Sequence, residues 1–339
     1  MKKKILSLLM VSAMAFSMVA CGSSTDTSDD SAAEATETTE DSASDGQSYK
    51  VGVIQLVQHD ALDAATEGFQ AALTDQLGDS VEVDVQNAAG DSATCSTIAN
   101  TFVSEGVDLI MANATASLQA AQAATDSIPI VATSITDYAT ALSIDDWTGT
   151  TGINVTGTAD LAPLDQQAAM LNELFPDAKN VGILYCSAEP NSSYQATTIT
   201  EYLEKDGYTV TEYTFADTND VASVTQSACD NSDVIYIPTD NTAASCTETI
   251  SGVALAAGIP IIAGEEGICS GCGVATLSIS YYDIGYAAGL QAVKILTSGE
   301  DPASMEIEYA SDFTKEYNAD ICQQMGITVP DDYVAIAAE

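Results

Sequence analysis

Short apolar runs alternate with amphipathic segments along most of this chain, and that alternation is the strongest constraint on its fold. The apolar run 51–57 is typical of a parallel strand that is buried on both faces. Leu62, Ala65, Phe69 and Leu73 then recur at the spacing of one helix face. Further strands are expected at 81–85, 108–111, 128–131, 181–185, 208–215, 234–238 and 259–263, and further helices at 98–103, 115–124, 161–174, 194–205, 221–229, 242–257 and 281–295.

This order of elements predicts the fold class. Repeated strand–helix–strand units with short connections favour parallel sheets that are covered by helices on both faces. The units form two series of about 100 residues each, so the sequence predicts an α/β protein of two doubly wound parallel-sheet lobes in tandem. Hydrophobic residues make up 46% of the chain, which is enough for a sizeable core.

The N-terminus has the features of an export signal. Lysines at 2–4 precede an uncharged, mostly apolar stretch at 5–20, which is too short to span a membrane comfortably and matches the core of a secretory signal peptide. Small residues lead directly into Cys21, as in the bacterial lipobox. The pattern implies that residues 1–20 are removed and that Cys21 is lipidated. The alternative is an ordinary signal peptide with an incidental cysteine.

A tether is expected between this signal and the folded part. Residues 21–48 are mainly Ser, Thr, Ala and acids, with almost no large apolar side chain. Such a composition cannot bury enough surface to offset the entropy of ordering, which favours a disordered, acidic tether. No later segment is apolar enough to cross a membrane, so we expect an extracytoplasmic protein that a lipid anchors to the cell membrane, as in Gram-positive lipoproteins.

The charge balance excludes several classes of partner. Acidic residues outnumber basic ones by 50 to 8, and every basic residue is a lysine. A surface this negative repels phosphate backbones, which excludes nucleic acid. Because the chain has no arginine, no guanidinium can clamp a carboxylate or a phosphate. An anionic ligand must instead be held by backbone amides, hydroxyls or one of the few lysines.

Polar residues follow the predicted strands of the first series, at the sheet edge where ligands bind in open α/β folds. Asn113, Thr115 and Ala116 open a predicted helix, whose first N–H groups favour an anion. Ser134 follows the next strand and adds a hydroxyl donor. This edge is therefore a candidate seat for a carboxylate.

Acidic residues follow the strands of the second series. Asp240 and Glu265 each come shortly after a predicted strand, and their negative charge suits an ammonium group. A carboxylate seat opposite an ammonium seat predicts a site for an α-amino acid. The alternative for each of these residues is a plain helix N-cap.

Several motifs resemble a known family. They are IQLVQHDALD at 54–63, NAAGD at 87–91, TSITD at 133–137, SAEPNS at 187–192, TDNT at 239–242, GEEG at 264–267 and YYDIG at 281–285. With these motifs the chain resembles the substrate-binding lipoproteins of ABC importers, which have the type I periplasmic-binding fold. Among them it is similar to the branch that binds tryptophan, tyrosine or phenylalanine.

The resemblance implies a division into lobes that a multi-strand hinge joins. Lobe 1 would comprise 49–156 plus 276–302, and lobe 2 would comprise 157–275 plus 303–339. The expected function is capture of an aromatic amino acid by hinge closure and delivery to an ABC permease, by a monomer without enzyme activity, cofactor or metal. The alternatives are a surface sensor or adhesin, or a binder of a nucleoside or sugar on the same fold.

The resemblance also implies the residues that contact the ligand. It assigns Gln58, Thr115, Ala116 and Ser134 to the ligand side of lobe 1, and Asn191, Asp240 and Glu265 to that of lobe 2. Tyr138 stands where the family often has proline, so it either adds an aromatic wall or covers the hinge. Tyr185 is a second candidate for an aromatic wall, although a single tyrosine more often packs in a core.

His59 and a cysteine pair complete the candidates. His59 is the only histidine, and we favour a loop residue that contacts ligand or solvent over a lone general base. Cys269 and Cys272 form a C-x-x-C pair, for which a local disulfide is favoured in an exported protein. A redox couple and half of a zinc site are the alternatives.

Overall fold

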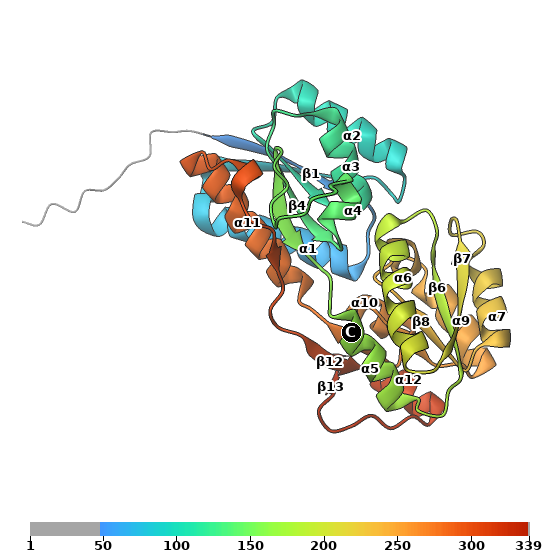
Figure 1. Ribbon diagram of the computed structural model, residues 1–339. Helices are drawn as coiled ribbons and strands as arrows, with labels where there is room; N and C mark the ends of the chain where they lie inside the picture. Colours follow the sequence, from blue (N-terminus) through green and yellow to red (C-terminus); the bar gives the residue numbers. More distant parts are fainter. Residues whose placement is uncertain (1–47, 338–339) are drawn as a thin grey trace, which may run out of the picture. The chain divides into compact units, whose positions relative to one another are not determined.

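A computed structural model describes residues 48–337 of the chain (Figure 1). The predicted signal peptide, the lipidated Cys21 and nearly all of the predicted tether lie outside these residues. The described part contains two sheets, each with helices on both faces, as the fold-class prediction required. The two-lobed α/β architecture is therefore confirmed.

The first lobe is built on a six-stranded sheet in which every strand pair is parallel. Its strands, in spatial order, are β11 (Glu308–Tyr309), β5 (Val155–Ala159), β4 (Ile130–Ile135), β3 (Leu109–Asn113), β1 (Tyr49–Gln55) and β2 (Val81–Asn87). One face packs against α1 (Asp60–Leu77) and α11 (Tyr281–Ser298), and the other packs against α2 (Ser92–Glu105), α3 (Thr115–Ala124) and α4 (Tyr138–Leu142). A short 3₁₀ turn, η1 (Gly78–Ser80), follows α1, and another, η2 (Pro302–Ser304), follows α11.

The second lobe is built on a seven-stranded sheet that is parallel except between β10 and β12. Its strands, in spatial order, are β13 (Val334–Ala335), β12 (Thr314–Tyr317), β10 (Ala275–Ser278), β9 (Ile261–Ala263), β8 (Val234–Ile237), β6 (Asn180–Cys186) and β7 (Thr209–Phe215). Cores on its two faces involve α5 (Leu164–Leu174), α6 (Pro190–Lys205) and α12 (Ala319–Met325) on one side, and α7 (Val221–Asn231), α8 (Asn241–Ala244), α9 (Thr247–Ala257) and α10 (Glu266–Cys272) on the other.

The chain crosses between the two sheets after β5, after β10 and after β11. These crossings differ from the predicted lobe boundaries by a few residues. The predicted boundary after residue 156 cuts β5, which lies wholly in the first sheet, whereas β10, mostly assigned to lobe 1, lies in the second sheet. β11 returns to the first sheet although 303–339 was assigned to lobe 2. An apolar strand has the same pattern whichever sheet it joins, so its sequence alone does not place it.

Tyr138 lies in the core of the first lobe and not at an aromatic wall. Its ring is 1% exposed, and its hydroxyl donates to the backbone carbonyls of Ala132 and Thr158, both at 3.0 Å. Gly157 makes room for this hydroxyl, because a Cβ on Gly157 would lie 2.5 Å from it. Tyr138 thus joins β4 to β5 where their register shifts.

Replacing Tyr138 by Phe should destabilise the first lobe. Tyr138→Phe leaves two buried carbonyl oxygens without this donor, so we expect the free energy of unfolding to fall by about 1–3 kcal/mol. Urea denaturation measures the change. The matched control is Tyr202→Phe, because Tyr202 is 38% exposed and its substitution should cost no more than about 0.5 kcal/mol. Equal losses in the two variants would contradict the role of the Tyr138 hydroxyl.

Candidate functional site

A small polar cavity lies where the strand ends of the two lobes meet. Its volume is about 10 Å³, which is room for roughly one water-sized group. It is lined by His59, Ala61, Leu62, Ser134, Asp160, Asn191, Thr239, Asp240, Asn241, Glu265 and Tyr281. We call it the deep cavity. Both lobes contribute to it, and four of its residues were predicted from the sequence.

Three carboxyl groups of the deep cavity are almost completely buried, and no lysine lines it. Asp160, Asp240 and Glu265 are at most 4% exposed. Burial disfavours the charged form of a carboxyl group, so it raises the pKa of Asp160 to about 6 and that of Glu265 to about 7. The pKa of Asp240 is also raised, first by burial and then by the nearby Glu189. The cavity therefore favours a positively charged group.

Asp240 and Glu265 also cap helices, so the alternative considered from the sequence applies to both. Asp240 accepts hydrogen bonds from the backbone N–H of Ala243 and of Cys186, each at 2.7 Å. Glu265 accepts from the N–H groups of Gly267 and Ile268 at the start of α10. Each carboxylate oxygen can accept more than one hydrogen bond, so capping leaves acceptor capacity toward the cavity. The caps fix the orientation of both carboxyl groups.

A chain of hydrogen bonds connects the cavity to the hinge and crosses between the lobes. Asp160, which follows β5, accepts from Tyr281 at 3.0 Å and from Thr136 at 3.1 Å. The Thr136 hydroxyl in turn accepts from Gln195 of the second lobe at 3.2 Å. Asp160 and Tyr281 lie at two of the points where the chain crosses between the sheets, so the hinge and the cavity share their side chains.

A larger cleft adjoins the deep cavity and shares Asn191 and Asn241 with it. Its volume is about 320 Å³. Residues of the first lobe that line it are Leu56, Val57, Ala89, Gly90, Ser92, Ala116 and Gln119, and residues of the second are Cys186, Ala188, Glu189, Pro190, Asn191, Ala216, Asp217, Thr218, Asn241, Thr242 and Ser245. We call it the outer cleft.

The helix that opens at the outer cleft has no side-chain cap. α3 follows Ala114, which has a φ of 83° and no side chain that can accept a hydrogen bond from the first turn. Unpaired N–H groups at a helix start attract an anion. Ala116, in the first turn of α3, lines the cleft. Of the residues predicted to form a carboxylate seat, Ala116 lines this cleft at the start of α3, whereas Ser134 lines the deep cavity.

The remaining predicted residues lie elsewhere. Asn113 is fully buried and donates to the Leu62 carbonyl and the Thr66 hydroxyl, so it holds α1 against the sheet. Gln58 is exposed and lines neither the deep cavity nor the outer cleft. Thr115 is buried next to Ala116 but lines neither space.

Tyr185, the second candidate for an aromatic wall, packs in the core of the second lobe. Its ring is 7% exposed, and its hydroxyl donates to Glu212 on the neighbouring strand at 2.7 Å. It lines neither the deep cavity nor the outer cleft.

The sequence patterns did not indicate Asp160, Tyr281 or Glu189 as candidate site residues. Asp160 follows β5, a strand that the apolar pattern did not predict, so its place after a strand end was not apparent from the sequence. Glu189 accepts from the backbone and side chains of both Asn241 and Thr242, at 2.7–3.1 Å. It joins two loops of the second lobe and lines the outer cleft. The SAEPNS motif at 187–192 contains Glu189 and was the sequence feature that could have indicated it.

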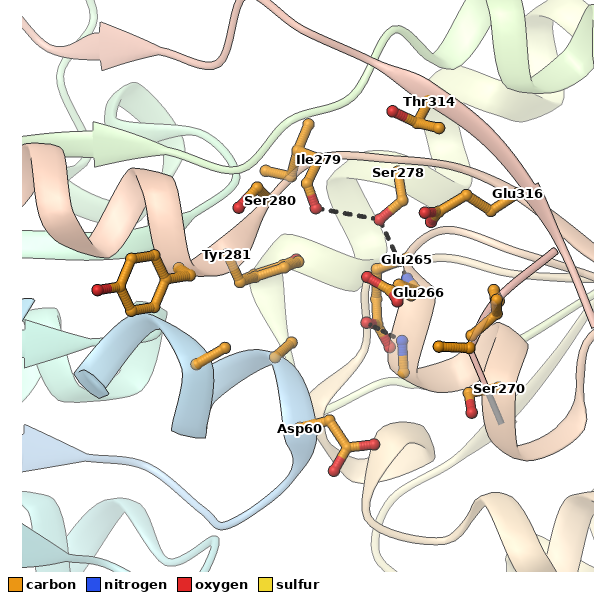
Figure 2. A pocket seen from close by; sticks show the side chains of 16 residues that line it. Asp60, Glu265, Glu266, Ser270, Ser278, Ile279, Ser280, Tyr281, Thr314 and Glu316 are labelled. Carbon is orange, nitrogen blue, oxygen red and sulfur yellow. Dashed lines mark hydrogen bonds between the residues drawn. The ribbon is translucent and has the colours of Figure 1, made fainter. Parts of the chain in front are cut away.

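A third space, of about 440 Å³, lies at the hinge (Figure 2). Asp60, Glu265, Glu266 and Glu316 line it, and no basic residue does. Burial and the nearby Glu266 raise the pKa of Glu316 to about 7. Across residues 48–337, however, no group of three or more His, Cys, Asp or Glu side chains is placed to hold a metal ion.

The predicted disulfide does not form in this structure. Cys269 and Cys272 are free, buried thiols on α10, and Cys272 donates to the Ile268 carbonyl one turn earlier. The pair lies within a helix that is part of the apolar core of the second lobe. Both side chains are accounted for by packing, which the C-x-x-C spacing alone did not show.

Two lobes that enclose a polar cleft at their facing strand ends define a two-lobed solute-binding protein. Residues 50–339 match the family model described as ABC transporter substrate binding protein, and the chain belongs to this family. It is 38% identical over 298 residues to a protein named tyrosine-binding protein from Clostridioides difficile (strain R20291), a match that covers 87% of this chain and 84% of that relative. Among the described helices, none has the length and apolar character that a membrane crossing requires.

Solved structures with similar sequences share the fold. An ABC domain from Streptococcus pneumoniae in complex with L-Trp is 33% identical, with a TM-score of 0.81 over 84% of this chain and 97% of that one. A ligand-free, open substrate-binding protein with adhesive properties from Clostridium difficile is 35% identical, with a TM-score of 0.66 over 86% of this chain and 100% of that one.

Asp160 should make the stability of the protein depend on pH. Its pKa rises from 3.8 to about 6 on folding, so between these values the folded state holds a proton that the unfolded state has released. The stabilisation is complete below the unfolded pKa and is lost as the pH rises through about 6. Titration of Asp160 should therefore lower the unfolding free energy of the wild type by about 2–3 kcal/mol between about pH 4 and pH 7. Asp160→Asn should lack this part of the pH dependence.

Urea denaturation across this pH range measures the effect. The matched control is Asp165→Asn, because Asp165 is an exposed carboxyl group on α5. Its profile should follow that of the wild type. Parallel profiles for Asp160→Asn and the wild type would show that Asp160 does not titrate as its burial implies.

Proposed function

We propose that the protein captures an aromatic L-amino acid (tyrosine, tryptophan or phenylalanine) in the cleft between its lobes and delivers it to an ABC permease. The observation that carries this proposal is the pairing of an acid-lined cavity with an uncapped helix start. The deep cavity favours a cation, and the first turn of α3 favours an anion. The two spaces adjoin, since both are lined by Asn191 and Asn241.

The α-ammonium group fits the deep cavity, and the α-carboxylate fits the start of α3. An ammonium nitrogen is about the size of a water molecule, which matches the volume of about 10 Å³. Asp160, Asp240 and Glu265 supply acceptors for its protons. Because the chain has no arginine, the backbone N–H groups around Ala116 take the role of a carboxylate clamp.

The side chain of the ligand fits the outer cleft. Its volume of about 320 Å³ lies at the lower end of the range for small-molecule sites. Leu56, Val57 and Pro190 offer apolar surface, while Ala89 and Gly90 leave space for a ring. The name of the C. difficile relative and the L-Trp of the S. pneumoniae structure support an aromatic amino acid.

A calorimetric series of ligands tests the proposal. We expect L-tyrosine, L-tryptophan or L-phenylalanine to bind, and a ligand at one hundred times its Kd to stabilise the protein by about 2.7 kcal/mol. Two analogues of tyrosine remove one charge each. Tyramine lacks the carboxylate and 3-(4-hydroxyphenyl)propionate lacks the amine, and each should bind at least about 10-fold more weakly because a charged hydrogen-bonding partner is lost.

Other results would favour other ligands. Equal binding of tyrosine and both analogues would show that the site does not recognise the zwitterion. Binding of a nucleoside or a sugar in place of any amino acid would retain the fold and replace the ligand. If none of these ligands binds, the sensor or adhesin becomes the favoured function. The similar C. difficile protein that is described as having adhesive properties supports this alternative.

We also propose that Cys21 carries the lipid that anchors the protein. A basic n-region, an apolar core and small residues before the cysteine support this. We expect Cys21→Ser to move the protein from the membrane fraction to the soluble fraction, because a diacylated terminus is the anchor. Fractionation and immunoblotting measure it. Cys246→Ser, in a half-buried cysteine of the second lobe, is the matched control and should stay with the membrane. Retention of both variants would contradict lipidation.

A further inference from the structure

His59 bridges the two lobes through one of its ring nitrogens. It precedes α1 of the first lobe, and its Nε2 lies 3.2 Å from Oδ1 of Asn241, at the start of α8 in the second lobe. The ring therefore occupies a point at which opening of the cleft would separate donor from acceptor.

The surroundings of Asn241 determine which nitrogen of His59 carries the proton. Nδ2 of Asn241 donates to the Glu189 carboxylate at 2.7 Å, and the backbone N–H of Asn241 donates to the same oxygen at 3.1 Å. A flipped amide would place Oδ1 against the carboxylate, so Oδ1 faces His59 and accepts. The Nε2 of His59 is then the donor. Burial lowers the pKa of His59, which keeps the ring neutral at neutral pH.

The other ring nitrogen, Nδ1, consequently carries no proton and can only accept a hydrogen bond. Nδ1 of His59 is buried and has no hydrogen-bond partner, and the same is true of the Ser134 hydroxyl oxygen. Both residues line the deep cavity, together with Asp160, Asp240 and Glu265. A buried polar atom without a partner costs about 1–3 kcal/mol, so two such atoms on residues that line one cavity point to a group that satisfies them. The group must donate protons, since Nδ1 can only accept.

We infer that His59 is a ligand-binding latch: its Nδ1 accepts a hydrogen bond from the ligand's amine while its Nε2 holds the second lobe through Asn241. This inference rests on the proposed function. The same ring thereby binds the ligand's amine and holds the two lobes together. A ligand without an N–H donor leaves Nδ1 unpaired, so His59 discriminates amines from compounds that lack them.

Two conservative substitutions separate the two roles of the ring. The amide of asparagine reaches the position of Nδ1 but not that of Nε2, and the amide of glutamine reaches the position of Nε2. His59→Asn thus keeps an acceptor for the ligand and loses the contact with Asn241. His59→Gln keeps a donor to Asn241 and loses the acceptor in the cavity. Each variant is the control for the other.

The expected results differ in affinity and in kinetics. His59→Gln should weaken the binding of L-tyrosine by about 10- to 100-fold, the effect of losing a hydrogen bond to a charged group. The same variant should bind 3-(4-hydroxyphenyl)propionate as the wild type does, because that analogue has no amine. His59→Asn should retain most of the affinity but release L-tyrosine about 2- to 10-fold faster, as measured by stopped-flow fluorescence.

Nitrogen NMR tests the inference in the wild-type protein, whether or not the variants fold. The single histidine of the chain gives one pair of ring-nitrogen signals. We expect a protonated Nε2 and an unprotonated Nδ1, and we expect the Nδ1 signal to shift when L-tyrosine is added. A protonated Nδ1 at neutral pH, or an Nδ1 signal that does not respond to saturating tyrosine, would overturn the inference.

The proposed function and this inference fail in different ways. If the wild type binds none of the three aromatic amino acids, both fail. If the wild type binds L-tyrosine and His59→Gln binds it equally well, the function stands and the latch is wrong.

Discussion

Three carboxyl groups buried between two lobes, with no lysine lining their cavity, are the constraint on which the rest of this structure depends. Asp160, Asp240 and Glu265 are held by backbone N–H groups and hydroxyls, which orient carboxylates without neutralising them. Their raised pKa values express the cost of that arrangement. Helix capping explains the orientation of Asp240 and Glu265 but not why no basic residue lines their cavity. In the proposed function, the cationic group of the ligand supplies that missing interaction.

The same constraint connects recognition to movement. Asp160 and Tyr281 lie where the chain crosses between the sheets and are hydrogen-bonded to each other, so a charge in the cavity acts directly on the hinge. On the opposite side, Glu189 holds Asn241, and Asn241 contacts His59 across the lobes. Side chains of the candidate site, of the hinge and of the contact between the lobes thus lie close to one another. Coupling between the site and the hinge needs no further intervening residues.

The sequence predicted the architecture well because alternating strands and helices carry strong periodic signals. Four of the residues that it predicted for the site, Ser134, Asn191, Asp240 and Glu265, line one cavity, since residues after the ends of parallel strands gather at one edge of a sheet. The errors arise where local pattern does not determine tertiary position. Asn113 follows the rule for a site residue yet points into the core, where its amide joins α1 to the sheet. Tyr138 was a candidate aromatic wall because it stands where the family often has proline, but Gly157 leaves space for its hydroxyl that only the packed sheet shows.

The energy of the contacts between the lobes explains why closure needs a ligand. The cross-lobe hydrogen bonds from His59 to Asn241 and from Gln195 to Thr136 are between neutral groups, each worth about 1 kcal/mol. Burying three carboxyl groups costs more than such bonds return unless those groups are neutralised by protons or by a cation. The fold matches that of the L-Trp complex with a TM-score of 0.81 and that of the ligand-free, open protein with a TM-score of 0.66, at similar identity. In the proposed function, an ammonium group in the deep cavity supplies the interaction that neutralises these carboxyl groups, so the contacts between the lobes become favourable at neutral pH when a charged amine binds.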